Sequence, residues 1–135
     1  MWRRGLVVGL CGLLGSGSVL AAPDPPRCKG SPKLVGDCYQ VHGRIYFSNG
    51  TPSIRIWKVG TKRILGVPHG EEDGDPEIAP LPKVIGNTDI LDYAVFADFV
   101  VCPLTKEKAG AMQMVCVESA THLVRSGSGP AKEEQ

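Results

Sequence analysis

The chain has 135 residues, of which 42% are hydrophobic, 6% aromatic and 21% charged, with 15 basic and 14 acidic residues. This length suits one small domain with a modest core. The near balance of charge argues against a protein that attracts polyanions through its overall charge, so any ligand must be recognised by a local patch.

The first 21 residues have the features of a secretory signal. Two arginines precede an apolar stretch from Leu6 to Leu14, and small residues then lead to a cleavage site after Ala21. This stretch is shorter than the roughly 20 apolar residues that cross a bilayer, so we expect no transmembrane anchor in the mature chain. Lipidation of Cys11 is an alternative to simple removal with the signal. The sequence predicts export to the periplasm or the cell exterior.

Four cysteines remain after cleavage: Cys28, Cys38, Cys102 and Cys116. An even number in a small exported domain predicts two disulfides. Of the three possible connectivities we expect Cys28–Cys38 and Cys102–Cys116, because these close two short local loops. The intervals do not match the Cys-x2-Cys spacing of a zinc site, so we expect no metal.

Strand patterns dominate the rest of the chain. Alternating apolar and polar residues predict strands at 39–48, around Ile54 and Ile56, and at 63–67, 93–104 and 112–124. One layer of strands cannot bury both faces. We therefore expect an all-β domain over 22–125, a small disulfide-stabilised barrel or two-sheet sandwich of five to six antiparallel strands. An OB-like barrel is one such arrangement, and 126–135 should form a flexible tail.

Residues 68–87 form a proline-rich, acidic segment between the predicted strands. It is longer than most connections, which indicates either a functional or a disordered loop. Its acids, between Glu71 and Glu77, match no calcium-binding spacing. They are expected to be solvated or to fold over the basic hairpin that precedes them. A short helical turn is expected to begin near Thr88 or Asp89.

The predicted strand at 39–48 and the strand around Ile54 and Ile56 form a hairpin. The register of this hairpin can be argued from its charges. A two-residue Asn49-Gly50 turn would place Arg44 opposite Arg55, and like charges in direct opposition are destabilising. It would also put Pro52 inside the hydrogen-bonded ladder, where proline lacks a donor. A four-residue loop from Asn49 to Pro52 avoids both conflicts, so we predict that register.

In this register one face of the hairpin carries a set of basic and aromatic side chains: His42, Arg44, Tyr46, Arg55 and Trp57. Arg44 opposes Trp57, and Tyr46 opposes Arg55. Flat rings beside guanidinium groups can stack on sugars or bases and pair with phosphate or carboxylate. The face is therefore a predicted binding site for an anionic or glycan ligand. The alternative is that the Arg–aromatic pairs only stabilise the sheet.

The sequence offers little support for catalysis. His42, His69 and His122 are isolated along the chain, Asp92 and Asp98 are a weak candidate pair, and no nucleophile-elbow or phosphate-loop pattern is present. We therefore predict a non-catalytic binding protein without a cofactor and without a specific nucleic-acid signal. A protein-partner or inhibitor module that uses 68–87, and a small secreted hydrolase, are the alternatives.

Overall fold

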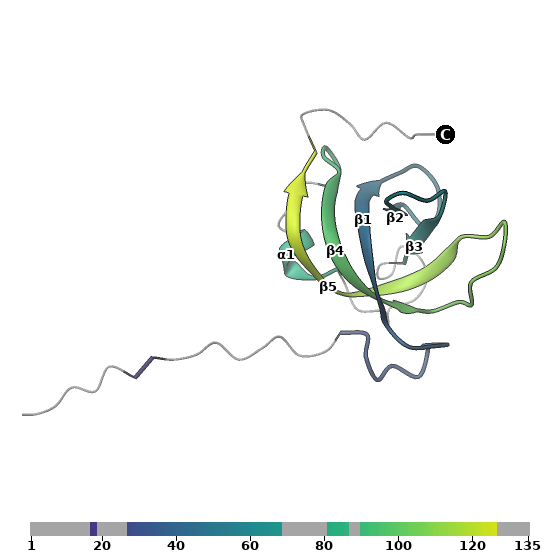
Figure 1. Ribbon diagram of the computed structural model, residues 1–135, viewed down its shortest axis with the longest axis horizontal. Helices are drawn as coiled ribbons and strands as arrows, with labels where there is room; N and C mark the ends of the chain where they lie inside the picture. The colour runs from purple at the N-terminus through teal and green to yellow at the C-terminus, as the bar shows by residue number, and fades with distance from the viewer. Residues whose placement is uncertain (1–16, 19–26, 69–80, 87–89, 127–135) are drawn as a thin grey trace, which may run out of the picture.

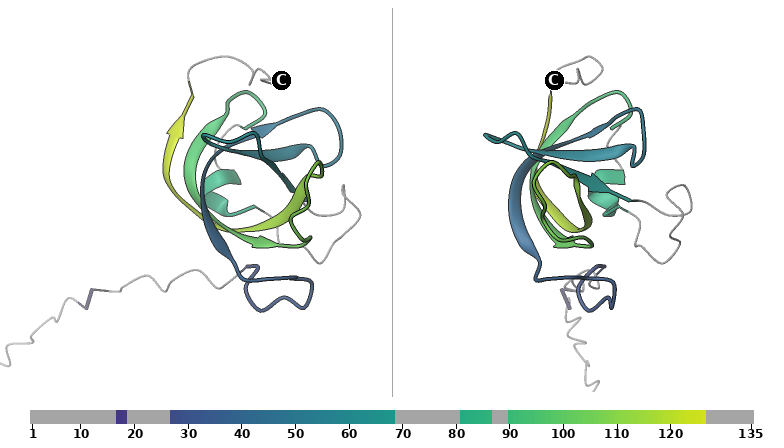
Figure 2. Two further views of the ribbon diagram at one scale, coloured as in Figure 1. Left: turned by 45° about the vertical axis from the view of Figure 1, so that its right-hand side comes forward. Right: turned by 90° about the vertical axis from the view of Figure 1, so that its right-hand side faces the viewer.

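The computed structural model describes residues 17–18, 27–68, 81–86 and 90–126. The regular elements are β1 (Tyr39–Phe47), β2 (Ile54–Lys58), β3 (Ile64–Val67), α1 (Lys83–Gly86), β4 (Val95–Pro103) and β5 (Gln113–Arg125). The strands form one closed barrel in the order β1-β2-β3-β5-β4 (Figures 1 and 2). The predicted small all-β, disulfide-stabilised fold is confirmed, and of the two expected architectures the chain adopts the barrel.

One strand pairing differs from the expected antiparallel pattern. β3 and β5 run parallel, in a short register of Leu65 with Gln113 and Gly66 with Met114, whereas the other pairings are antiparallel. A closed ring with an odd number of strands cannot alternate direction throughout. The five-stranded closure therefore requires one parallel contact, and the purely antiparallel expectation is wrong at this contact.

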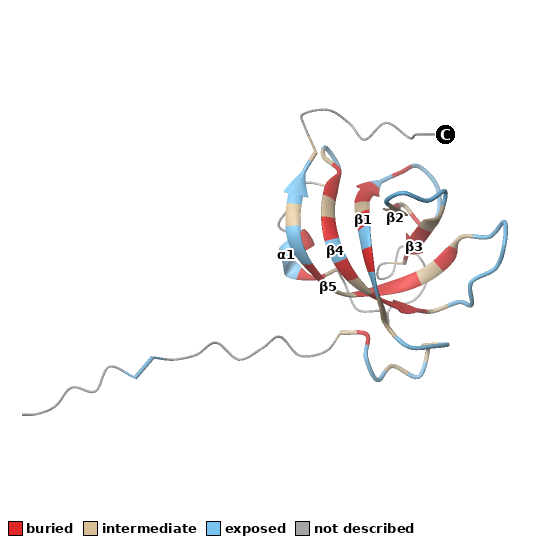
Figure 3. Cartoon of the chain, in the orientation of Figure 1, coloured by how far each residue is buried: buried red, intermediate tan, exposed pale blue. Residues whose placement is uncertain are grey.

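The core fills the barrel with side chains that alternate along the strands. Ile45, Ile56, Phe99, Val101 and Val115 are completely buried, and Figure 3 shows buried segments interrupted by more exposed ones along the strands. Ile85 of α1 is also fully buried and joins the same cluster. The apolar residues that alternate with polar ones in the sequence thus form the barrel interior.

The predicted hairpin register is confirmed. Arg44 lies opposite Trp57 and Tyr46 opposite Arg55. Beyond the last strand pair, the Ser48 N–H donates to the Ser53 carbonyl at 2.7 Å, which leaves four residues in the loop. Arg44 and Arg55, which carry like charge, are therefore not directly opposite each other.

Gly66 lets the outer side of the β3–β5 contact pack closely. A Cβ at this position would lie 2.6 Å from Sδ of Met114, 2.8 Å from Cγ of Pro52 and 2.9 Å from Sδ of Met112. These distances are below ordinary van der Waals contact, so a side chain at Gly66 would require its neighbours to shift.

The structure contains one short helix among the described residues. α1 lies inside the segment predicted as a loop, whereas Thr88 and Asp89 are outside the described residues. The acidic run, the tail beyond residue 126 and nearly all of the predicted signal are also outside them. Among the described residues, no helix has the length and hydrophobicity to span a membrane.

The disulfides correct the predicted connectivity. Cys28 bonds to Cys116 and Cys38 to Cys102, at sequence separations of 88 and 64 residues. Cys102 and Cys116 are register partners on β4 and β5, yet each bonds to the N-terminal arm (residues 27–38) instead of to the other. The preference for local loops fails because the fold lays this arm beneath β4 and β5 (Figure 1).

The two long-range bonds should be directly observable and strongly stabilising. Peptide mapping of the non-reduced protein is expected to recover the pairs Cys28–Cys116 and Cys38–Cys102. Replacing Cys38 and Cys102 together by Ser should lower the free energy of unfolding by about 2–5 kcal/mol, because it frees a long loop in the unfolded chain. Recovery of a Cys102–Cys116 peptide from folded protein would contradict this connectivity.

Candidate functional site

The hairpin face is built around Arg44. Its guanidinium carbon lies 5.5 Å from the ring centroid of Tyr46 and 5.5 Å from that of Trp57. The first ring comes from the next outward position of β1 and the second from the register partner on β2. Nε of Arg44 is buried without a hydrogen-bond partner. The geometry is thus a guanidinium in contact with two aromatic rings.

Tyr46 and Arg55 have roles different from those predicted. Tyr46 is only 4% exposed, so its ring supports Arg44 and is not open to a ligand. Arg55 donates from Nε to the Pro52 carbonyl at 3.2 Å and from Nη2 to the Asn49 carbonyl at 3.4 Å. These bonds stabilise the hairpin loop. Fewer side chains than the five predicted are therefore available to contact a ligand.

Trp57 is half-buried, and its indole is also held by a residue of the β2–β3 turn. Its indole N–H donates to the Thr61 carbonyl at 2.7 Å, and the Thr61 hydroxyl donates to the Lys58 carbonyl at 2.8 Å. The β2–β3 turn therefore fixes the orientation of the indole. A fixed ring loses little conformational entropy when a ligand packs against it.

His42 extends this face onto β4 and β5. Its Nδ1 lies 2.8 Å from Oδ1 of Asp98, and Nδ1 of His122 lies 3.0 Å from Oδ2 of the same carboxylate. The three side chains are exposed by 60%, 52% and 82% for His42, Asp98 and His122 respectively. The histidines are isolated along the sequence, but the barrel joins two of them through one acid.

The pKa of Asp98 reflects these neighbours. The hydrogen bond from His42 lowers the pKa of the Asp98 carboxyl below its ordinary value, and the hydrogen bond from His122 acts in the same direction. The carboxyl therefore remains ionised over the physiological range. An ionised carboxylate only accepts hydrogen bonds, so each imidazole donates from Nδ1.

Two bulges in β5 explain how this strand places its polar side chains. Between the partners of Phe96 and Asp98, β5 contains one residue more than β4, and a second extra residue, Glu118, lies between the partners of Val100 and Val101. His122, at the first irregularity, has φ of 55°. Bulges redirect side chains and bend the strand locally. The alternation of the sequence gives no sign of them.

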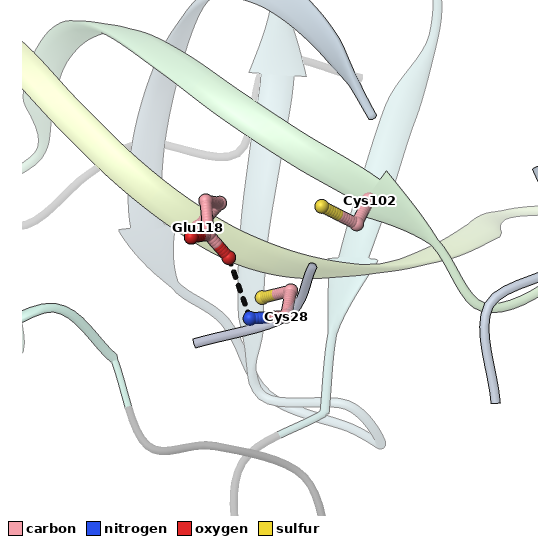
Figure 4. Close-up of side chains that lie close together, drawn as sticks. All are labelled: Cys28, Cys102 and Glu118. Atoms are coloured by element: carbon pink, nitrogen blue, oxygen red, sulfur yellow. Dashed lines mark hydrogen bonds between the residues drawn. The ribbon is translucent and has the colours of Figure 1, made fainter. Parts of the chain in front are cut away.

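Glu118 holds the N-terminal arm. Its carboxylate accepts hydrogen bonds from the backbone N–H groups of Arg27, Cys28 and Lys29. Figure 4 shows this carboxylate turned toward Cys28, with the sulfur of Cys102 nearby. These three residues lie close enough to resemble a metal site, but both cysteines are in disulfides, so no thiolate is available as a ligand.

A shallow hollow lies beside the hairpin face, between two turns. It is lined by Lys62, Arg63, Ile64, Gly110, Ala111 and Met112. The guanidinium of Arg63 is 3.3 Å from Oε1 of Glu107 and donates to the Lys108 carbonyl. Its charge is therefore compensated, unlike that of Arg44.

Comparisons of the chain with protein-family models, curated proteins and solved structures found no match. The site is consequently defined by its own geometry alone.

The Glu118 contact should give the protein a measurable dependence on acid. Partial desolvation raises the pKa of this carboxyl, but the backbone hydrogen bonds from Cys28, Lys29 and Arg27 outweigh it, and the pKa lies below its ordinary value of 4.5. The stabilisation is therefore complete above that value and is lost as pH falls through the lower folded-state pKa. We expect Glu118→Gln to cost about 1 kcal/mol at neutral pH, and less near pH 3.

Urea unfolding of both proteins across this pH range measures the difference. Glu107→Gln is a matched control, because Glu107 is exposed and its ion pair with Arg63 should contribute little. A cost for Glu118→Gln that stays constant down to pH 3 would rule out the proposed linkage.

The left-handed backbone conformation at His122 predicts a difference in stability between two substitutions at this position. His122→Ala and His122→Gly both remove the contact with Asp98, but only glycine adopts a positive φ without steric conflict. We expect the glycine variant to be more stable than the alanine variant by about 1 kcal/mol in denaturant unfolding. The reverse order would show that the bulge does not have this conformation.

Proposed function

We propose that the protein is an exported, non-catalytic binding module that holds an anionic or glycan ligand on the outer face of the β1–β2 hairpin. The observation that supports this most directly is the environment of Arg44. Its guanidinium is stacked on two rings and has no carboxylate partner among the described residues. A positioned and uncompensated cation is suited to pair with a ligand oxyanion.

The energetics of Arg44 favour a role beyond the stability of the sheet. Tyr46 and Trp57 hold the planar guanidinium in one orientation, which reduces the entropy lost on binding. The partly exposed indole of Trp57 adds an apolar edge against which a sugar ring can pack.

Export to the periplasm or the cell exterior is part of this proposal. Two disulfides are consistent with an exported protein. The signal-like character of the first 21 residues supports the finer assignment. A protein-partner contact through 68–87 stays a prediction, since much of that segment is outside the described residues. A small secreted hydrolase also stays a prediction.

The proposal predicts that Arg44 dominates binding to anionic glycans. With heparin as probe, at low ionic strength, Arg44→Gln should weaken binding on the order of tenfold or more, because a charge-assisted hydrogen bond is lost. Arg44→Lys should retain part of the affinity, since it keeps the charge but loses the planar fork. Isothermal titration calorimetry measures both effects.

Lys106→Gln serves as the charge-matched control, because Lys106 is exposed in the β4–β5 connection. Near-UV circular dichroism would establish that each variant keeps its tertiary structure. Equal losses for Arg44→Gln and Lys106→Gln would mean that binding is merely electrostatic, and the proposed site would be incorrect.

A further inference from the structure

The Arg44 site does not end at the hairpin. His42 and Arg44 are two residues apart on β1, so their side chains leave the same side of the sheet about 7 Å apart along the strand. His42 lies opposite Asp98 in the β1–β4 register, and His122 approaches Asp98 from β5. A row of three titratable groups on three neighbouring strands therefore adjoins the Arg44 cation.

Asp98 determines which ring nitrogens face outward. Both Nδ1 atoms contact its carboxylate, one at each oxygen, so both neutral rings carry their proton on Nδ1. The second nitrogen, Nε2, is then an acceptor. Since the side chains of His42 and His122 are 60% and 82% exposed, the Nε2 atoms are on the solvent side of the row.

Protonation of a ring must add the new proton at Nε2. This converts an outward acceptor into an outward donor and adds a positive charge, while the bond to Asp98 is retained. With both rings neutral, the row carries one net negative charge. With both protonated, it carries one net positive charge, and imidazoles make this change between about pH 5 and 8.

We propose that the His42–Asp98–His122 row is a proton-gated oxyanion subsite of the same binding face. In mildly acidic conditions the two Nε2–H groups donate to a sulfate or phosphate group of an anionic glycan whose neighbouring oxyanion pairs with Arg44. Above neutral pH the uncompensated carboxylate of Asp98 repels that group. The inference rests on the proposed function and adds the ligand group and its control by protons.

The other described charged groups near the row do not produce this change in net charge between pH 5 and 8. They are held as follows: Arg44 on Tyr46 and Trp57, Lys58 over the ring of Tyr39 at 5.8 Å, Arg125 over the ring of Tyr93 at 4.7 Å, and Glu118 on the backbone of the N-terminal arm. Arginine and lysine stay charged between pH 5 and 8, and so does a carboxylate. The histidines among the described residues are the two of this row.

The test compares binding at two pH values with a probe of constant charge. Heparin hexasaccharide is suitable because its sulfates stay ionised, and polyphosphate forms a second arm that separates phosphate from sulfate recognition. Calorimetry on the oxidised protein, at about pH 5.5 and about pH 8 and at equal ionic strength, is expected to give binding on the order of tenfold tighter at the lower pH. His42→Gln combined with His122→Gln should abolish this difference in affinity between the two pH values.

Two further measurements separate gating from a structural role. Asp98→Asn should bind heparin more tightly than wild type at pH 8, because the repelling charge is gone. By linkage, heparin added at about pH 5.5 should favour the protonated form of both rings, which proton NMR of the ring Cε1–H signals can follow.

The outcomes distinguish the two proposals. Heparin binding that needs Arg44 but has the same affinity at both pH values would overturn the gated subsite and leave the proposed function in place. A pH effect that survives in the double histidine variant would also overturn it. Absence of binding at both pH values would overturn the proposed function itself.

Discussion

The parallel contact between β3 and β5 is the constraint on which the barrel depends. Five strands cannot close with alternating directions, so one pairing had to be parallel, and it is confined to two register pairs. Such a short ladder offers few hydrogen bonds, and the sulfurs of Met112 and Met114 pack over Gly66 on its outer side. A side chain at Gly66 would require Met112, Met114 and Pro52 to shift at the position where the ring closes.

β5 connects this closure to the candidate site. The strand begins beside β3 and continues along β4, where its two extra residues interrupt the regular ladder. One interruption directs Glu118 toward the N-terminal arm, and the other brings His122 to Asp98. The same strand therefore closes the barrel, anchors the arm and completes the polar row.

The fold could be predicted from the sequence wherever local chemistry decided the outcome. The strands follow from apolar alternation, and the hairpin register follows from the need to separate Arg44 from Arg55. The disulfide connectivity and the His42–Asp98–His122 row could not be predicted, because both depend on which distant strands become neighbours. The burial of Tyr46 was missed for a related reason, since alternation identifies a face but not what covers it.

The two disulfides are nested, with Cys38–Cys102 enclosed by Cys28–Cys116. A chain that crosses a membrane from its N-terminus presents Cys28 and Cys38 to the oxidising side well before either native partner arrives. The first pair able to meet is therefore a non-native one, ten residues apart. For the export that we propose, correct maturation would then require either that oxidation wait for β5 or that an early bond be exchanged.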